Sequence, residues 1–266
     1  MELRFQKMQG AGNEILIVDQ RVTNPVAPDS AVLNELNRAT STCPFDQLMW
    51  LSDAEESDAV ASYRVFNRDG SEVEQCGNGV RCVAVLLASR DRSLPPEFIL
   101  ESPAGRVVAR VTSETRAAVD MGIPRFDDRI TDLSVNDRPI EVNLVSMGNP
   151  HCILDVDDVQ SADVGGLGPA IERHVRFPDR INVGFMQVVD RKNIRLRVYE
   201  RGAGETLACG TGACAAVASG CRRDLLDELV TVQLPGGQLV VSWRGAEAHM
   251  WLIGDVTFTG EGKIDL

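Results

Sequence analysis

Two cysteines stand in the same short motif at distant places in the chain. Cys76 begins the sequence CGNG and Cys209 begins CGTG, each between a strand-like alternating run and a long apolar run. Each cysteine is therefore predicted at a strand-to-helix junction. The first turn of a helix carries unpaired N–H groups and partial positive charge, which lower the pKa of a thiol and bind anions.

Two such thiols could act as acid and base on one carbon. If a carboxylate were held by both helix starts, the adjacent carbon would lie between Cys76 and Cys209, one removing its proton and the other supplying one. The glycines after each cysteine would let a carboxylate approach the backbone closely. Because such a proton is very weakly acidic, the helix N-termini and exclusion of water must stabilise the carbanion.

No cofactor or metal is expected to assist this chemistry. Pyridoxal phosphate needs a Schiff-base lysine, and the only lysines, Lys7, Lys192 and Lys263, have no Gly-rich phosphate-binding setting. The sequence has neither a Cys-x-x-Cys pair nor a Cys/His cluster with zinc-finger spacing, so no metal site is predicted.

A non-catalytic reading of these cysteines also exists. A lone buried cysteine at a helix end is usually a small hydrophobe, but duplication of the whole motif favours a chemical role. As a member of a different class, the chain could be a thiol redox switch or a noncatalytic binding protein in which Cys76 and Cys209 form a disulfide. The remaining cysteines lack the repeat and are interpreted as packing residues: Cys43, Cys82, Cys152, Cys214 and Cys221.

The repeat extends well beyond the motif. Residues 64–79 align without a gap on residues 197–212, with seven of sixteen positions identical, and residues 102–122 echo residues 234–254. We predict two similar domains, 1–123 and 124–255, joined near the polar segment 124–140, with the active site in the cleft between them. Whether the last strand, 256–266, pairs with the first half is not decided by the sequence.

Each half has a readable order of elements. Residues 194–198 alternate as a half-buried strand, followed by a tight turn near 202–204 that corresponds to 69–71. Helices are predicted over 77–90 and 210–222, and their lack of a polar face indicates enclosure on most sides. Pro-x-Gly turns then indicate hairpins. The predicted fold class is α+β, with two pseudo-symmetric halves of mostly antiparallel strands around a central helix.

Composition narrows the class of protein. The chain has 266 residues and a net charge of −12, which argues against a nucleic-acid partner. Nothing at the N-terminus indicates an export signal, and no apolar run reaches membrane-spanning length, so no membrane partner and a cytoplasmic location are expected. Seven cysteines, an odd number in a chain of this size, are expected to be reduced.

With these residues in place, the chain resembles the diaminopimelate epimerase family over essentially its whole length. The segments that carry the resemblance are GAGNEIL (10–16), FDQL (45–48), NRDGSEVEQCGNGVRC (67–82), MGNPHC (147–152), INVGFMQ (181–187) and YERGAGETLACGTGACAA (199–216). The resemblance implies cofactor-independent interconversion of LL- and meso-2,6-diaminopimelate for lysine and peptidoglycan synthesis, by an enzyme that often forms homodimers.

The resemblance also implies roles for particular residues. Cys76 and Cys209 would be the two bases, with His151 helping Cys76 and Glu200 helping Cys209. The main chain at Gly77, Asn78, Gly210 and Thr211 would hold the carboxylate at the reacting end. The distal end of the substrate would be read by Asn13, Gln47, Asn67, Asn149, Asn182, Glu200 and Arg201.

Two further interpretations bear on this set. Taken alone, an asparagine after glycine is usually a turn residue, and a Glu-Arg pair could be a solvated strand end; the functional roles rest on the whole set. A proline or hydroxyproline racemase shares the two-thiol plan. A proline-sized substrate has no second charged end, and would not call for Arg201 together with converging asparagines.

Overall fold

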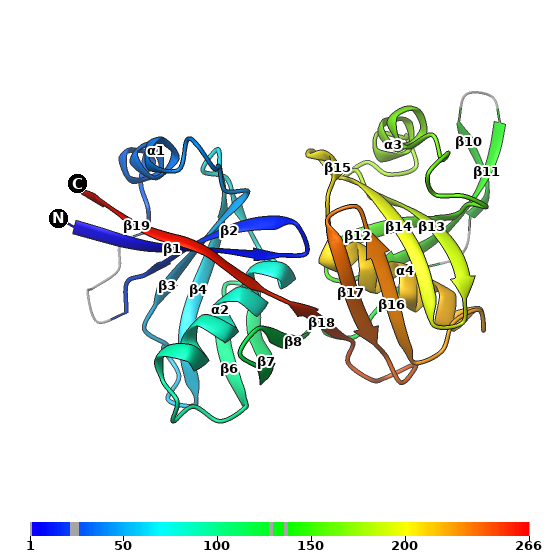
Figure 1. Cartoon of the computed structure of the whole chain (residues 1–266). Helices are drawn as coiled ribbons and strands as arrows, with labels where there is room; N and C mark the ends of the chain where they lie inside the picture. Colours follow the sequence, from blue (N-terminus) through cyan, green and yellow to red (C-terminus); the bar gives the residue numbers. More distant parts are fainter. Residues whose placement is uncertain (1, 22–26, 128–129, 136–137, 266) are drawn as a thin grey trace. The chain divides into compact units, whose positions relative to one another are not determined.

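The fold consists of two units that repeat one order of strands and helices (Figure 1). The computed structural model describes residues 2–21, 27–127, 130–135 and 138–265. Unit 1 comprises Met1–Asp120 and Gly254–Leu266, and unit 2 comprises Met121–Ile253.

Unit 1 is built from strands, one outer helix and one inner helix. Its elements are β1 (Glu2–Gly10), β2 (Asn13–Asp19), α1 (Ser30–Ala39), β3 (Gln47–Ser52), β4 (Ala59–Asn67), β5 (Glu72–Val73), α2 (Gly77–Arg90), β6 (Glu97–Ser102), β7 (Gly105–Ser113), β8 (Arg116–Asp120) and β19 (Thr257–Asp265). The C-terminal strand β19 pairs antiparallel with β1.

Unit 2 follows the same plan. Its elements are β9 (Arg125–Phe126), β10 (Ile130–Val135), β11 (Arg138–Ser146), β12 (Pro150–Asp155), α3 (Val164–Glu172), β13 (Asn182–Asp190), β14 (Asn193–Glu200), β15 (Gly204–Thr206), α4 (Gly210–Arg222), β16 (Leu229–Leu234) and β17 (Gly237–Ser242). Strand β18 (Trp251–Asp255) pairs with β17 and continues across the boundary into the segment that leads to β19.

Strand pairing repeats between the units. In unit 1, β2 and β3 are parallel, β4 lies antiparallel to β3 and parallel to β6, and β6 and β7 form a hairpin. In unit 2 the same relations hold for β12 with β13, β14 with β13 and β16, and β16 with β17. The predicted α+β fold with two pseudo-symmetric halves is confirmed.

The predicted central helices begin and end at the expected residues. In α2 every residue from Gly77 to Leu87 is buried, and strands β1, β2, β3, β7 and β8 contact it. In α4 burial extends from Gly212 to Gly220, against β11, β12, β13, β14 and β17. A helix enclosed in this way has no polar face, which is why both sequences read as continuous small and apolar residues.

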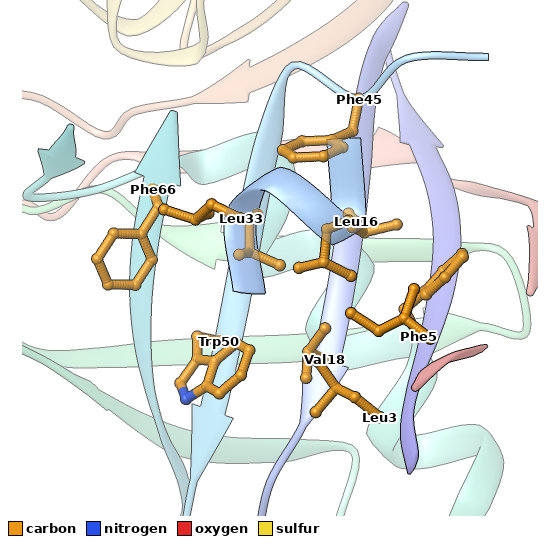
Figure 2. Close-up of a cluster of buried hydrophobic side chains, with 11 residues drawn as sticks. Leu3, Phe5, Leu16, Val18, Leu33, Phe45, Trp50 and Phe66 are labelled. Carbon is orange, nitrogen blue, oxygen red and sulfur yellow. The ribbon is translucent and has the colours of Figure 1, made fainter. Parts of the chain in front are cut away.

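A second helix in each unit has no counterpart in the sequence prediction. Helix α1 places Leu33 and Leu36 in a core with side chains from β1 to β4, and Figure 2 shows Leu33 among Leu16, Trp50 and Phe66. Helix α3 packs Val164 and Ile171 into the matching cluster of unit 2. Asp29 and Asp163 cap α1 and α3 with their carboxylates, which is a sequence signal for both starts, but the three glycines and Pro169 of α3 are poor helix formers and obscure its pattern.

The segment 124–140, expected as a polar join, contains strands instead. Strand β9, strand β10 and the start of β11 lie within it, while residues 128–129 and 136–137 lie outside the described residues. Strand β10 forms a hairpin with β11, and Leu133 and Val135 are buried in the unit 2 core. Ser134 between them is exposed, and the polar composition of the segment concealed the strand.

Truncation of a core leucine should destabilise unit 2 far more than the same change at its surface. Leu196 on β14 is 1% exposed and Leu229 on β16, the neighbouring strand, is 56% exposed. We expect Leu196→Ala to lower the free energy of unfolding by about 3 kcal/mol, since it leaves a cavity. Leu229→Ala should cost less than about 1 kcal/mol. Urea denaturation followed by circular dichroism measures both, and equal costs would contradict the assigned core.

Candidate active site

A cysteine caps each central helix with its sulfur. Cys76 and Cys209 both have extended backbone conformations as the N-cap residues of α2 and α4. Gly79 N–H donates to Cys76 Sγ at 3.2 Å, and Gly212 N–H donates to Cys209 Sγ at 3.4 Å. The first N–H groups of a helix have no intrahelical acceptor, so each cap places a sulfur beside donors that can hold an anion.

The third residue of each helix is closely surrounded by other side chains. A Cβ at Gly212 would stand 3.2 Å from Cys209 Sγ and 3.1 Å from Val198, and a Cβ at Gly79 would overlap the Met49 sulfur of β3. The second glycine of each motif therefore provides space for the neighbouring strand, and Gly212 also for the Cys209 thiol.

In unit 1 three predicted polar residues lie at the same end of three neighbouring strands. Asn13 begins β2, Gln47 begins β3 and Asn67 ends β4, and Gln47 is directly opposite Asn67 in the strand ladder. Gln47 Nε2 donates to Asn67 Oδ1 at 3.4 Å. Asn13 Oδ1 and Gln47 Oε1 are buried acceptors with no hydrogen-bond partner among the described residues, so each can accept a further donor.

Helix α2 also carries a buried cation that sequence reasoning missed. Arg81 is fully buried, its Nη2 donates to Asn78 Oδ1 at 2.8 Å, and its Nη1 donates to Gly77 O at 3.4 Å. Both acceptors belong to the first turn, so Arg81 fixes the backbone that follows Cys76. An arginine inside an otherwise apolar helix run was the available signal, because such a residue is rarely buried without a specific partner.

In unit 2 a chain of hydrogen bonds joins His151 to Cys209. His151 Nε2–H donates to Asn149 Oδ1 at 3.1 Å, and Asn149 Nδ2 donates to Thr211 Oγ1 at 3.3 Å. The Thr211 hydroxyl lies 3.5 Å from Cys209 Sγ and can donate to it. This network assigns the His151 tautomer. His151 Nδ1 is left as a buried acceptor without a partner in the described part of the chain.

Burial keeps His151 neutral. The ring is fully buried, and this burial, together with the nearby positive charge of Arg201, lowers the pKa of His151 to about 3. At neutral pH the imidazole is therefore uncharged, and its Nδ1 lone pair can accept a hydrogen bond.

Glu200 interacts with the Cys209 thiol in the same unit. Burial and the Glu200 charge raise the pKa of Cys209 well above its ordinary value, although the Thr211 hydroxyl and Gly212 N–H act in the opposite direction. Burial also raises the pKa of Glu200, which accepts hydrogen bonds from Thr206 Oγ1 and the Cys209 thiol. The expectation that the helix start lowers the pKa is wrong for Cys209, because burial and a neighbouring carboxylate outweigh the helix dipole.

The turn after β14 carries Arg201. Asn182 Oδ1 accepts the Arg201 N–H at 3.0 Å, and Asn182 Nδ2 donates to Pro150 O at 2.9 Å. The Arg201 side chain is exposed and Nη1 donates to Asp179 O at 3.3 Å. Asn182 therefore links two loops through its side chain, and it retains one Nδ2 hydrogen for a ligand.

The other cysteines divide by burial, and all seven are free thiols. Cys82, Cys152 and Cys214 are buried as predicted, and Cys221 is half-buried. The packing interpretation is wrong for Cys43, which is exposed in the loop between α1 and β3.

Two general findings concern metals and membranes. The described residues contain no group of three or more His, Cys, Asp or Glu side chains that could hold a metal ion. Within the same residues, no helix is long and apolar enough to span a membrane.

Similar solved structures define the fold class. A phenazine biosynthesis protein of the PhzF family from Bacillus anthracis matches with a TM-score of 0.75 at 15% identity, covering 100% of each chain. A hydroxyproline epimerase from Agrobacterium vitis, with bound trans-4-hydroxy-L-proline, matches with a TM-score of 0.72 at 18% identity, over 99% of this chain and 91% of that one. The molecule has the fold that these proteins share.

Sequence similarity defines the family within that fold class. The family model for diaminopimelate epimerase matches residues 5–126 and 143–259. A protein named diaminopimelate epimerase from Alkalilimnicola ehrlichii is 46% identical over 281 aligned residues, which cover 100% of both chains. The chain therefore belongs to the diaminopimelate epimerase family, whose members are isomerases.

Removal of the Glu200 charge should make Cys209 more reactive at fixed pH. The carboxylate raises the pKa of the thiol, so Glu200→Gln should lower that pKa and increase the thiolate fraction near pH 8. We expect the alkylation rate of Cys209 by iodoacetamide to rise roughly three- to tenfold. Mass spectrometry of the Cys209 peptide measures the rate.

The matched control is Glu205→Gln on the same hairpin, whose carboxylate is paired with Arg197. It should leave the Cys209 rate unchanged. An equal rate in Glu200→Gln and wild type would show that Glu200 does not control this thiol.

Proposed function

We propose that the chain interconverts LL- and meso-2,6-diaminopimelate by proton transfer between the substrate and two cysteines, without a cofactor. Membership of the diaminopimelate epimerase family supports the substrate and the reaction. The observation that carries the mechanism is the thiol cap found once in each unit, with Cys76 on α2 and Cys209 on α4.

The proton balance of the proposed reaction is simple. One cysteine, as thiolate, removes the proton from the α-carbon, and the other, as thiol, donates a proton to the opposite face of the same carbon. The substrate gains and loses one proton, and the two sulfurs exchange protonation states. First-turn N–H groups at Gly77, Asn78, Gly210 and Thr211 would hold the carboxylate and stabilise the carbanion-like transition state.

Each thiol is proposed to have its own helper. Glu200, which accepts a hydrogen bond from the Cys209 thiol, would take its proton when Cys209 acts as base. His151, neutral and with an unprotonated Nδ1, would serve Cys76 in the same way. The pairing of His151 with Cys76 follows from the family resemblance, whereas the hydrogen bonds through Asn149 and Thr211 run to Cys209.

The distal end of diaminopimelate carries one ammonium and one carboxylate. The unpartnered oxygens of Asn13 and Gln47 suit the ammonium, and the exposed Arg201 guanidinium suits the carboxylate. We propose that Asn67, Asn149, Asn182 and Glu200 complete this set. A proline-sized substrate would leave these groups without partners, which favours diaminopimelate over proline.

Location, pathway and assembly extend the proposal. Family membership supports a step in lysine and peptidoglycan precursor synthesis, and we propose that a cytoplasmic homodimer carries it out. Light scattering of the purified protein would test the last point.

Incubation in D₂O tests the reaction and the two bases. Wild-type protein should introduce deuterium at one α-carbon of LL-diaminopimelate and none into proline, as read by NMR.

Cys76→Ala and Cys209→Ala should each slow epimerisation by about 10²- to 10⁴-fold, the range for loss of a general acid or base. Binding of a substrate analogue should remain measurable, because the carboxylate donors are main-chain N–H groups. Deuterium uptake into proline instead would refute the proposal.

Removal of a buried acceptor tests distal-end recognition. Gln47→Met keeps the length of the side chain but removes the unpartnered Oε1. We expect the KM for diaminopimelate to rise roughly 10- to 100-fold, since hydrogen bonds to charged groups are worth about 1.5–3 kcal/mol, while kcat changes little. Gln6→Met on β1, outside the proposed site, is the control. An unchanged KM in Gln47→Met would place the ammonium elsewhere.

A further inference from the structure

A carboxylate outside the predicted site is almost completely removed from solvent in unit 2. Glu172 ends helix α3, and its side chain is 1% exposed. Glutamate is rarely buried to this degree without specific partners. Glu172 belongs to no motif of the sequence, and its burial follows from the packing of α3.

The partners of Glu172 are one backbone amide and two arginines. Its Oε1 accepts the Gly202 N–H at 2.9 Å and lies 3.5 Å from Arg180 Nη1. Its Oε2 lies 3.3 Å from Arg173 Nε. The arginine side chains are 52% and 65% exposed, so they compensate the charge from the solvent side. The remaining partner, the Gly202 amide, belongs to the turn that follows Glu200 and Arg201.

Gly202 is the middle residue of the turn that carries Arg201. The turn joins β14 to β15, and Gly202 has a φ of 76°, a conformation that glycine adopts without strain. Ala203 N–H donates to Glu200 O at 3.2 Å, which closes the turn. Asn182 Oδ1 holds the Arg201 N–H on one side, and Glu172 holds the Gly202 N–H on the other. Two consecutive amides are thus fixed by buried side chains.

Helix α3 is well placed to act as this support. It contacts β13, β14 and β15, and Gly168 approaches the Tyr199 ring so closely that any Cβ would overlap it. The carboxylate therefore reaches the turn from a helix packed on the strands that carry Glu200. A rigid support of this kind reduces the ordering needed when an exposed side chain binds a ligand.

We propose that Glu172 is a positioning residue that holds the Arg201 turn in its binding conformation, and so sets the affinity of the enzyme for the distal carboxylate of its substrate. This inference rests on the proposed function. Glu172 does not touch the substrate; it acts through the backbone of Gly202. Loss of the Glu172 carboxylate leaves the two thiols and their helpers intact. The turn must then become ordered when the substrate binds, which lowers the affinity.

A double-mutant cycle tests the proposal on the full-length enzyme. Glu172→Ala should raise the KM for diaminopimelate roughly 5- to 30-fold and change kcat less than about threefold. In an Arg201→Ala background, Glu172→Ala should have almost no further effect, since the side chain it positions is absent. Glu172→Gln keeps an oxygen that can accept the Gly202 N–H, and should restore most of the affinity.

The matched control is Glu205→Ala on β15. This carboxylate is also paired with an arginine, Arg197, but none of its hydrogen bonds goes to the 201–203 turn. It should leave KM unchanged. If Glu172→Ala does not fold, Glu172→Asp withdraws the carboxylate from Gly202 by one methylene and enters the same cycle.

Hydrogen exchange provides a readout that needs no substrate. The Gly202 amide should exchange at least tenfold faster in Glu172→Ala than in wild type, and the protection should return in Glu172→Gln. Unchanged exchange, an unchanged KM, or additive effects of Glu172→Ala and Arg201→Ala would each overturn the proposal. Wild-type protein without epimerase activity would instead refute the proposed function, and the exchange result would still decide whether Glu172 holds the turn.

Discussion

At the start of each central helix, a glycine N–H donates a hydrogen bond to the sulfur of the capping cysteine, and the rest of each unit is arranged to make this contact possible. Gly79 and Gly212 supply the donors, and Gly212 also leaves space for the Cys209 sulfur. The helices are enclosed by strands, which removes the thiols from solvent and gives backbone dipoles greater electrostatic weight. A surface helix with the same cap would have weaker influence on an anion because water would screen it.

The duplicated scaffold carries different electrostatics in its two copies. Arg81, on the helix of Cys76, has Cys214 at the corresponding place in unit 2, and Asn67 corresponds to Glu200. Unit 1 therefore sets a buried cation against the first turn of its helix, whereas unit 2 sets a carboxylate against its thiol. The two units share the backbone geometry of the cap, but their thiols have different charged neighbours. Such non-equivalence suits a reaction in which one sulfur is protonated when the other is not.

Several polar side chains in unit 2 hold other parts of the protein in place. Asn149 connects His151 to Thr211, Asn182 connects Pro150 to Arg201, and Glu172 holds Gly202. These contacts fix tautomers, rotamers and turns before any substrate arrives. Preorganisation of this kind reduces both the entropy lost on binding and the reorganisation needed during proton transfer.

The sequence by itself determined the duplication, the central helices with their boundaries, the hairpins and the two capping cysteines, because these features depend on periodicity, glycine and local turn chemistry. Tertiary structure alone decided the rest. Helix α3 forms despite weak local propensity because Val164 and Ile171 complete a core, and Glu172 reaches Gly202 only through that packing. The pKa of Cys209 rises, contrary to the helix-dipole argument, since burial and the approach of Glu200 are properties of the folded chain. Local sequence fixes which groups a helix start presents, and only the fold fixes how much water and which charges surround them.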